Sequence, residues 1–275
     1  MKPPAFDYLR PASVAEATAA LADRGDDARV LAGGQSLIAM LNMRLLEPQV
    51  LIDISRLDVL ARIDAHDKYV EVGAATTQSE LLAWRGLAAR LPLLGQALPF
   101  VGHRQTRNRG TVCGSIAHSD PSSELPLCLR VLGGEVVLSS RAGQRILAAE
   151  AFQTGLLSTA RAADEMILAV RFPTHRDGTG YAFREVARRH GDFAIVALAA
   201  VATRDTVRLG VGGVSDRPES REWELSDPAQ FDALLNALAW ELIGYDDIHA
   251  TAPYRRELVR RVGAKVIAEA IACRH

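Results

Sequence analysis

The chain has 275 residues, 48% of them hydrophobic, and its 33 acidic and 32 basic side chains leave a formal net charge of −1. This length and composition allow one large domain or two modest domains with a core of their own. Because the charges nearly cancel, the composition argues against a general electrostatic surface for DNA, RNA or anionic lipid.

The N-terminal residues, the lack of long apolar segments and the cysteine spacing bear on the cellular location and on possible cofactors. The first eight residues lack the apolar stretch of a secretory signal, and no later segment approaches the roughly 18 apolar residues of a membrane span. We therefore expect a cytoplasmic protein. The three cysteines form no Cys-x-x-Cys pair, so this chain alone supplies neither a disulfide framework nor the ligands of an iron–sulfur cluster, and no spacing typical of a metal site is present.

The first half of the chain alternates short strands and helices. A helix is predicted from Ser13, which is placed to cap it with Glu16 three residues later, and a capping box at Thr77 and Glu80 opens another helix that runs to about residue 90. The periodicity predicts further helices or helix-like segments at 37–46, 93–100 and 127–132, and strands at 29–32, 50–54, 69–73, 135–139 and 165–172.

The last hundred residues have a different pattern. The polar, glycine-rich segment 175–180 is the best linker or hairpin in the chain. Beyond it we predict three antiparallel strands at 181–187, 193–203 and 207–214, followed by two amphipathic helices at 231–243 and 253–272. The fold class is therefore α+β, with one domain over residues 1–175 and a second, smaller α+β domain over residues 176–275.

A pair of glycines follows the strand at 29–32. Gly33 and Gly34 allow the backbone N–H groups to approach an anion, and Ser36 adds a hydroxyl at the start of the next segment. A diphosphate fits such a loop. The alternative, a plain tight turn between strand and helix, stays open because a lone Gly-Gly pair is a weak signal.

The run from Arg107 to Pro126 is a stronger signal. It supplies small residues, a carboxylate at Glu124 that accepts hydrogen bonds from ribose or ribitol hydroxyls, and the four hydroxyls of Thr111, Ser115, Ser119 and Ser122. It contains no pairing of a nucleophile with a base. Two such loops predict a nucleotide cofactor held from two sides, and a polar surface loop before Pro126 is the alternative.

An arginine-rich strand lies in the second half. Alternation along residues 181–189 sends Arg184 and Arg188 to one face and Phe183 and Ala187 to the other. One of these arginines can reach back to a cofactor, whereas a solvated strand face is the default interpretation.

In this order and spacing, the motifs resemble the FAD-binding medium subunit of molybdenum-containing hydroxylases, in particular the aerobic carbon monoxide dehydrogenase type. The resemblance covers essentially the whole chain, and the segments that carry it are 1–8, 32–37, 73–77, 107–126 and 183–196. It implies the two-part FAD-binding domain of the vanillyl-alcohol-oxidase and molybdenum-hydroxylase flavoproteins, followed by a small domain of three antiparallel strands and helices.

The resemblance also implies a set of FAD-binding residues. The segment Ala32, Gly33, Gly34, Gln35, Ser36 and Leu37 would hold the diphosphate, and Val101 and Gly102 would border the isoalloxazine. The remaining cofactor-lining positions would be Thr111, Gly114, Ser115, Glu124, Ile167 and Leu168, with Arg184 near the ring where many relatives carry lysine. It implies no catalytic acid–base residue and no metal ligand in this chain.

Two positions depart from the family pattern. The chain has Cys113-Gly114-Ser115 where the family usually has Gly-Gly-Asn, and all these residues are small enough for FAD binding to survive. A reactive or flavin-linked thiol at Cys113 is one hypothesis, and a buried inert cysteine is the other. Arginine at position 184 keeps the charge of lysine but changes its hydrogen-bond geometry.

The resemblance implies the activity of one part of a larger enzyme. The FAD would receive electrons from the iron–sulfur clusters of a small partner subunit and pass them to an external acceptor, while a large subunit with the molybdenum cofactor oxidises the substrate, in a dimer of heterotrimers. Two alternatives remain: a self-sufficient flavin oxidase or reductase, and a non-catalytic scaffold subunit that has lost FAD.

Overall fold

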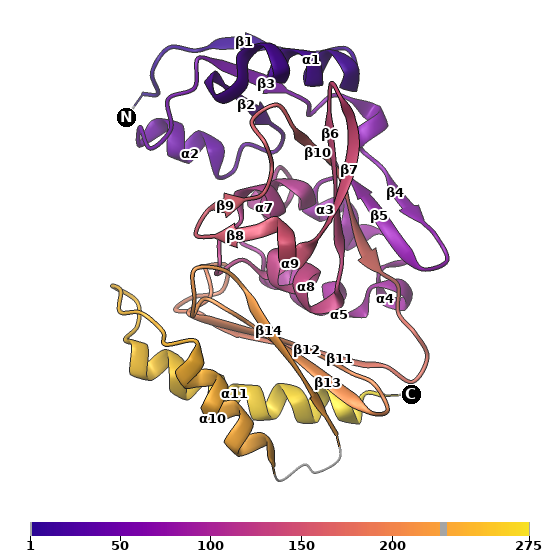
Figure 1. Cartoon of the computed structure of the whole chain (residues 1–275), viewed down its shortest axis with the longest axis vertical. Coiled ribbons are helices and arrows are strands. Elements are labelled where there is room, and N and C mark those ends of the chain that lie inside the picture. The colour runs from indigo at the N-terminus through magenta and orange to yellow at the C-terminus, as the bar shows by residue number, and fades with distance from the viewer. Residues whose placement is uncertain (1, 226–229, 275) are drawn as a thin grey trace.

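A small parallel sheet opens the fold. The computed structural model describes residues 2–225 and 230–274, and Figure 1 shows three layers stacked along its long axis. In the first layer β1 (Asp7–Leu9), β3 (Val50–Asp53) and β2 (Ala28–Leu31) pair in parallel in that order. Helices α1 (Val14–Arg24) and α2 (Leu37–Asn42) flank them. The Ser13 hydroxyl caps α1 as predicted, accepting a hydrogen bond of 3.1 Å from the Glu16 N–H.

The middle layer is built on a five-stranded antiparallel sheet with the order β4-β5-β10-β6-β7. Its strands are β4 (Ile63–Ala65), β5 (Tyr69–Gly73), β6 (Glu135–Ser140), β7 (Gly143–Ala148) and β10 (Met166–Pro173), with a short ribbon of β8 (Gln153–Gly155) and β9 (Ser158–Thr159) beside it. Its helices are α3 (Gln78–Ala83), α4 (Leu87–Arg90), α5 (Pro92–Ala97), α6 (Arg104–Arg107), α7 (Val112–His118), α8 (Glu124–Leu132) and α9 (Ala149–Phe152).

The last layer is a four-stranded antiparallel sheet covered by two helices. Strands β11 (Gly180–Val186), β12 (Val196–Ala202), β13 (Thr206–Gly212) and β14 (Glu219–Glu224) follow one another in order. Helices α10 (Phe231–Glu241) and α11 (Ala252–Ala272) lie on the face turned away from the middle layer. The predicted three-stranded sheet lacked β14, because the polar sequence of that strand, with only Trp223 as a large apolar residue, gives no strand pattern.

Several hydrogen bonds join this last sheet to the middle layer, among them the three described here. The Gly213 N–H donates to the Pro121 carbonyl at 2.8 Å. The Gln96 side chain bridges β11 by accepting from the Phe183 N–H at 2.9 Å and donating to the Tyr181 carbonyl at 3.1 Å. The buried core of the first two layers extends into the inner face of β11, and a second core lies between the sheet and helices α10 and α11. The division at residue 175 stays a prediction.

Several elements differ from the sequence-based expectations. The helix predicted from Thr77 to about residue 90 is broken between α3 and α4 at Trp84, Arg85 and Gly86. The run 107–126 is mostly helical, because Thr111 caps α7 and a turn at Asp120 leads directly into α8. Strands β1, β4, β7, β8 and β9 have no clear period in the sequence, since they are short or lie at an exposed edge.

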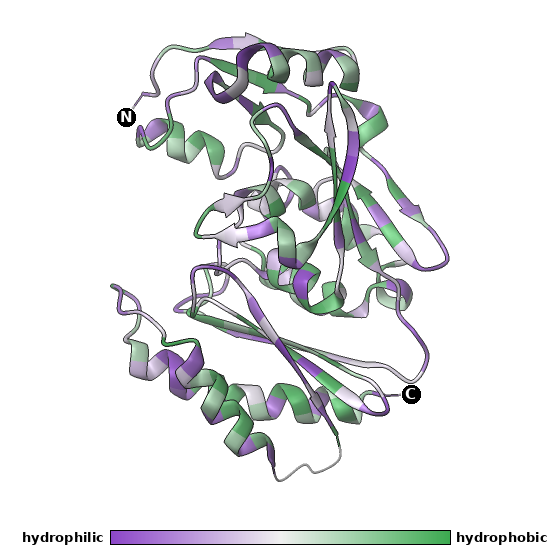
Figure 2. Cartoon of the chain, viewed as in Figure 1, coloured by the Kyte–Doolittle hydropathy of each residue, from purple (hydrophilic) through white to green (hydrophobic). Residues whose placement is uncertain are grey.

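The hydropathy pattern of the C-terminal helices fits their position on one face of the last sheet. In Figure 2 the helices α10 and α11 carry alternating hydrophobic and hydrophilic segments, as expected for helices that cover one face of a sheet. None of the helices in residues 2–225 and 230–274 combines the length and the apolar character needed to cross a bilayer. The cytoplasmic location stays a prediction.

Candidate functional site

A cavity of about 850 Å³ lies where the first and middle layers meet. It is lined by β2 and the following glycine loop, by α7 and the first residue of α8, and by segments 157–161 and 191–193. Its volume falls in the upper part of the range for small-molecule and cofactor sites. Loops that are far apart in the sequence therefore meet around one elongated space.

The first predicted loop lines this cavity along its whole length. All six residues from Ala32 to Leu37 contribute to the wall. Gly34 has a φ of +71°, which side chains rarely adopt, and the Ile38 N–H closes the turn by donating to the Gly34 carbonyl at 3.0 Å. The sequence thus folds here into a tight turn with its backbone exposed to the cavity.

The second predicted loop contributes through helix α7. Thr111, Gly114 and Ser115 line the cavity, and the Thr111 hydroxyl also caps the helix by accepting from the Gly114 N–H at 3.0 Å. Ser119 and Ser122 are not in the wall. Ser119 is fully buried at the end of α7 with a left-handed backbone, and the Ser122 N–H turns back to Asp120. Two of the four predicted hydroxyls are therefore lost to the turn between α7 and α8.

Glu124 begins α8 and faces the cavity with only 4% of its surface exposed. Burial is the main reason that the pKa of this carboxyl is raised to about 7; the Asp120 charge adds to the rise, while a backbone hydrogen bond and Arg107 oppose it. A carboxyl with this pKa is partly protonated at neutral pH, so it can donate a hydrogen bond as well as accept one.

Val101 and Gly102 form the wall at another part of the cavity. Arg107 holds this loop by donating to the Val101 carbonyl at 3.0 Å and the Gly102 carbonyl at 2.9 Å. Gly191 packs directly on it, since a Cβ there would lie 3.1 Å from the Gly102 carbonyl carbon. Phe193 follows and lines the cavity with 60% of its surface exposed. The last layer thus supplies part of the wall.

Two predicted site residues do not reach the cavity. Leu168 is partly buried against the main core beside Ile167, which does line the cavity. Arg184 lies on the opposite face of β11, where its guanidinium pairs with Glu269 on α11 at 2.5–2.9 Å. The alternation was correctly placed, but it directs Arg184 to the C-terminal helices. The Arg184 side chain therefore joins strand β11 to helix α11 within the last layer.

Several lining residues were not predicted, among them Gln78, Thr106, His118 and Arg161. The Gln78 side-chain oxygen is buried and has no hydrogen-bond partner among the described residues, although the residue is only 5% exposed. An unpaired buried amide oxygen is costly, so a ligand that donates a hydrogen bond fits this wall. The sequence pattern did not mark Gln78 as a site residue, because it directly follows the helix-capping Thr77 and looks like an ordinary residue of the first helical turn.

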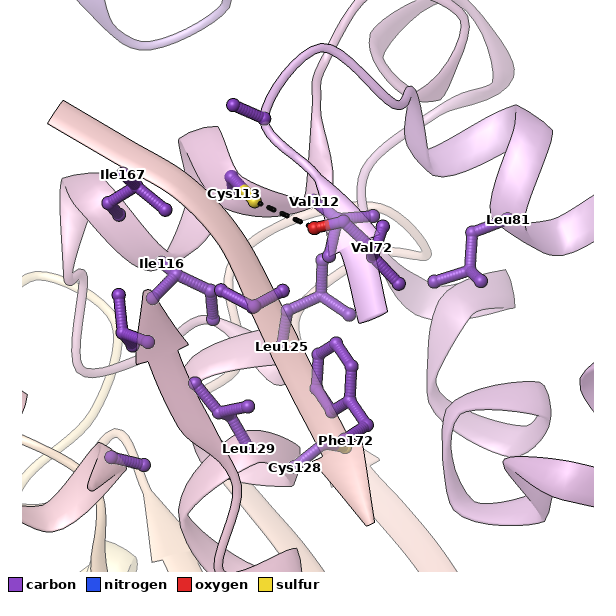
Figure 3. Close-up of a cluster of buried hydrophobic side chains, with 14 of the residues drawn as sticks. Val72, Leu81, Val112, Cys113, Ile116, Leu125, Cys128, Leu129, Ile167 and Phe172 are labelled. Carbon is purple, nitrogen blue, oxygen red and sulfur yellow. Dashed lines mark hydrogen bonds between the residues drawn. The ribbon is translucent and has the colours of Figure 1, made fainter. Parts of the chain in front are cut away.

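Cys113 is part of both the wall and the core. Figure 3 shows its sulfur directed at the Val72 carbonyl oxygen, at 3.4 Å, among Val112, Ile116 and Ile167. Burial raises the pKa of this thiol far above its ordinary value. The structure therefore favours the buried inert cysteine over the reactive thiol.

The cavity has the two glycine-rich walls, the hydroxyls and the unpaired amide that a dinucleotide requires, and the comparison with known sequences agrees. Residues 4–175 match the family described as the FAD binding domain in molybdopterin dehydrogenase. The chain belongs to this family. It is a flavoprotein subunit of the oxidoreductase class, with FAD as its cofactor.

Members of the family resemble the chain over nearly its full length. The 6-hydroxypseudooxynicotine dehydrogenase complex subunit alpha of Paenarthrobacter nicotinovorans is 36% identical over 98% of this chain and 96% of that protein. The carbon monoxide dehydrogenase medium chain of Afipia carboxidovorans is 37% identical over 79% of this chain and 77% of that protein. A chain in the crystal structure of a cyanide-inactivated Cu,Mo-CO dehydrogenase superposes with a TM-score of 0.93 at 32% identity, covering 99% of both chains.

Proposed function

We propose that this chain binds FAD in the cavity between its first and middle layers and transfers electrons within a molybdenum-containing hydroxylase or dehydrogenase complex. The observation that carries the proposal is the meeting of segments 32–37, 101–102 and 111–124 around one cavity of about 850 Å³. Bound FAD supplies reversible electron transfer in single or paired steps.

The residues of the wall divide the tasks of holding the cofactor. The backbone N–H groups of the 32–37 turn are suited to the diphosphate, and Gly34 in its left-handed conformation exposes them. Thr111, Ser115 and Glu124 are suited to the hydroxyls of ribitol or ribose, because each can accept a hydrogen bond. Val101 and Gly102 border the ring. This assignment, made without Leu168 and Arg184, is a proposal for thirteen positions of the wall: 32–37, 101, 102, 111, 114, 115, 124 and 167.

The proposal includes partner subunits. Within the described residues no three His, Cys, Asp or Glu side chains are grouped to hold a metal ion. We propose that the iron–sulfur clusters belong to a small subunit and the molybdenum cofactor to a large one, and that electrons leave the clusters through FAD to an external acceptor. Support comes from the names of the relatives, which are a subunit alpha of a dehydrogenase complex and a carbon monoxide dehydrogenase medium chain.

Titration of the purified full chain with FAD, followed by absorption and flavin fluorescence, tests the cofactor site. We expect one FAD per chain and a spectrum that a chemical reductant bleaches. Gln78→Leu removes the unpaired amide and is expected to weaken FAD binding by roughly tenfold. This is the change in affinity that the loss of one neutral hydrogen bond in a buried site produces. A folded chain that binds no FAD would leave the scaffold alternative.

The electron-transfer role is tested in the complex. The chain is co-expressed with candidate small and large subunits, FAD is removed, and a substrate that the complex oxidises is added with an external acceptor. We expect the iron–sulfur clusters to be reduced while the acceptor is not, and FAD to restore its reduction. If the FAD-loaded chain alone oxidises an organic substrate, the self-sufficient oxidase is the correct alternative.

A further inference from the structure

Arg255 on α11 is a fully buried arginine, with 1% of its surface exposed. A buried guanidinium is costly unless its donors are paired. Its Nη1 donates to the Ile195 carbonyl at 2.5 Å and to the Gly213 carbonyl at 2.7 Å. Its Nη2 donates to the Asp247 carboxylate at 2.6 Å, and its Nε donates to the Tyr245 carbonyl at 3.2 Å. One side chain therefore joins the start of β12, the turn after β13 and the loop before α11.

The contact with Ile195 lies at the base of a segment that reaches the cofactor cavity. The Ile195 N–H closes the loop between β11 and β12 by donating to the last residue of β11 at 2.8 Å, while Arg255 binds the carbonyl of the same residue. Within this loop, residues 191–193 line the cavity, and Gly191 packs on Gly102. Arg255 therefore holds this part of the cavity wall at its base.

The contact with Gly213 leads to a second part of the wall. Gly213 has a φ of +78°, and a Cβ there would lie 2.7 Å from the Ile195 carbonyl oxygen, so the two segments that Arg255 binds touch each other. The Gly213 N–H donates at 2.8 Å to the carbonyl of Pro121, in the turn that leads to Glu124. Glu124 faces the cavity. The guanidinium thus supports the wall at two points through the main chain.

The guanidinium itself is anchored by the loop between α10 and α11. Asp247 accepts hydrogen bonds from the N–H groups of His249 and Ala250, both at 2.8 Å, as well as from Arg255. Desolvation opposes ionisation of Asp247, but these hydrogen bonds outweigh it and hold its pKa below the ordinary value. The Arg255 guanidinium also lies over the Tyr245 ring, 4.3 Å from its centroid. The start of α11 lies on the same side of the molecule as α2 and the β8–β9 ribbon, which both line the cavity (Figure 1).

We propose that Arg255 is a positioning residue for the half of the FAD site that receives the flavin ring and the ribitol. The inference rests on the FAD site proposed above. Arg255 is not part of the cavity wall and acts only through the main chain that it binds. The two points that it supports lie beside Gly102 and before Glu124, whereas the diphosphate turn at 32–37 follows a strand of the first layer. A wall that is held in place before binding favours affinity, because less order is lost to ligand binding.

Two variants loosen the network to different degrees. Arg255→Lys keeps the charge but loses the planar fork that makes the four hydrogen bonds. Asp247→Asn keeps an oxygen that accepts from the two loop N–H groups, but it removes the ion pair with the guanidinium. We expect the dissociation constant of FAD, measured by flavin fluorescence, to rise at least about tenfold in Arg255→Lys and about threefold in Asp247→Asn.

Binding of ADP separates positioning from a general loss of structure. ADP carries the diphosphate and the adenosine but neither flavin nor ribitol, so we expect both variants to bind it, by calorimetry, within about twofold of the wild-type affinity. Leu235→Ala is the matched control for stability. Leu235 is 1% exposed in the core between the last sheet and its helices, so its truncation lowers the melting temperature without touching the Arg255 network. We expect this control to keep the wild-type affinities for both ligands.

Hydrogen exchange of the FAD-free full chain gives a readout that does not depend on the cofactor. In Asp247→Asn we expect peptides that cover residues 187–195 to exchange faster than in the wild type, because the base of that loop is held less firmly. Peptides from α1, which lies in the first layer, are expected to keep the wild-type rate.

Three results would overturn the proposal. The first is wild-type FAD affinity in a folded Asp247→Asn chain. The second is an equal loss of ADP and FAD affinity in the variants, since this indicates a general structural role. The third is unchanged hydrogen exchange over residues 187–195 in Asp247→Asn, which is decisive even if Arg255→Lys does not fold. A wild-type chain that binds no FAD contradicts the proposed function instead, while hydrogen exchange still tests whether Arg255 holds the loop.

Discussion

Gly33 lies directly against the main chain of Arg109. A Cβ at position 33 would be 2.1 Å from the Arg109 carbonyl oxygen and 2.8 Å from the Cα of Gly110. The glycine loop after β2 and the segment before α7 are therefore in backbone contact, and only glycine permits it. This contact fixes the spacing of the two loops that line the cavity.

Gly33→Ala is expected to separate these loops. The overlap is with main-chain atoms, so the backbone has to move, at a cost of about 1 to 3 kcal/mol or more. We expect FAD affinity to fall by at least about tenfold and the melting temperature to drop. Gly95→Ala is the control, because a Cβ there meets only a Leu87 side-chain atom at an ordinary 3.8 Å, and alanine favours the helix. Equal FAD affinity in both variants would contradict the importance of the contact.

Arg184→Ala separates the role implied by the family resemblance from the position in the structure. The side chain pairs with Glu269, and the two are 52% and 40% exposed. An exposed pair contributes less than about 1 kcal/mol to stability. By the same fluorescence titration, we expect the FAD affinity of the variant to stay within about twofold of the wild-type value, because the pair is exposed and Arg184 lies outside the cavity wall. The flavin spectrum is expected to be unchanged. A loss of affinity in Arg184→Ala that Arg184→Lys restores would instead place the side chain at the cofactor.

Glu71 on β5 is expected to make the free energy of unfolding depend on pH in the acidic range. Burial opposes ionisation, but hydrogen bonds from Arg171 at 2.8 Å and Arg62 at 2.6 Å outweigh it and hold the pKa of Glu71 below its ordinary value. A lowered pKa in the folded state gives stability that is present above the unfolded-state value and lost as the pH falls through the folded-state value.

Glu71→Gln is therefore expected to cost about 1 to 3 kcal/mol at neutral pH, the range for hydrogen bonds to charged groups. The difference from wild type should narrow as the pH falls below about 4. Urea unfolding across the pH range measures it. Glu135→Gln on β6, the other strand that pairs with β10, is the control, since Glu135 is 48% exposed and lies 3.6 Å from Arg171. If both variants lower the free energy of unfolding by the same amount, the two hydrogen bonds to the buried Glu71 do not contribute as argued.

The thiols provide a test of burial at the cavity wall. Cys113 and Cys128 are buried and Cys273 is exposed. Because burial raises the pKa of both buried thiols, the reactive thiolate is scarce. Iodoacetamide is expected to modify Cys273 alone in the folded chain and all three cysteines after unfolding, as read by mass spectrometry. Rapid modification of Cys113 in the folded, FAD-free chain would favour the reactive thiol.

Local signals predicted many elements well. Ser13 and Thr77 cap the helices that the sequence assigns to them, because a capping side chain bonds to a backbone N–H only three residues away. The strand predicted at residues 69–73 is β5 with the same bounds, although Val70 to Gly73 are all buried and the strand is not buried on one face alone. Strand β14 was missed because its pairing with β13 depends on a partner strand, and its polar side chains carry no such period.

The motifs of the cofactor site could be recognised from the residue types alone. Gly33, Gly34 and the Thr111 to Ser115 segment were chosen from residue type and order, and all lie along the cavity except Val112, which is in the core. Backbone freedom and hydroxyl groups are properties of the residues themselves, so they can be read before folding.

Which side chains share that cavity depends on how the three layers pack, and this could not be predicted from local sequence. Arg184 turns to Glu269 and Ser119 into a helix end, whereas Gln78 and Glu185 acquire unpaired buried oxygen atoms. Burial, partner and local charge depend on elements that are distant in the chain. The raised pKa of the buried Glu124 carboxyl is therefore a property of the fold, because it arises mainly from desolvation.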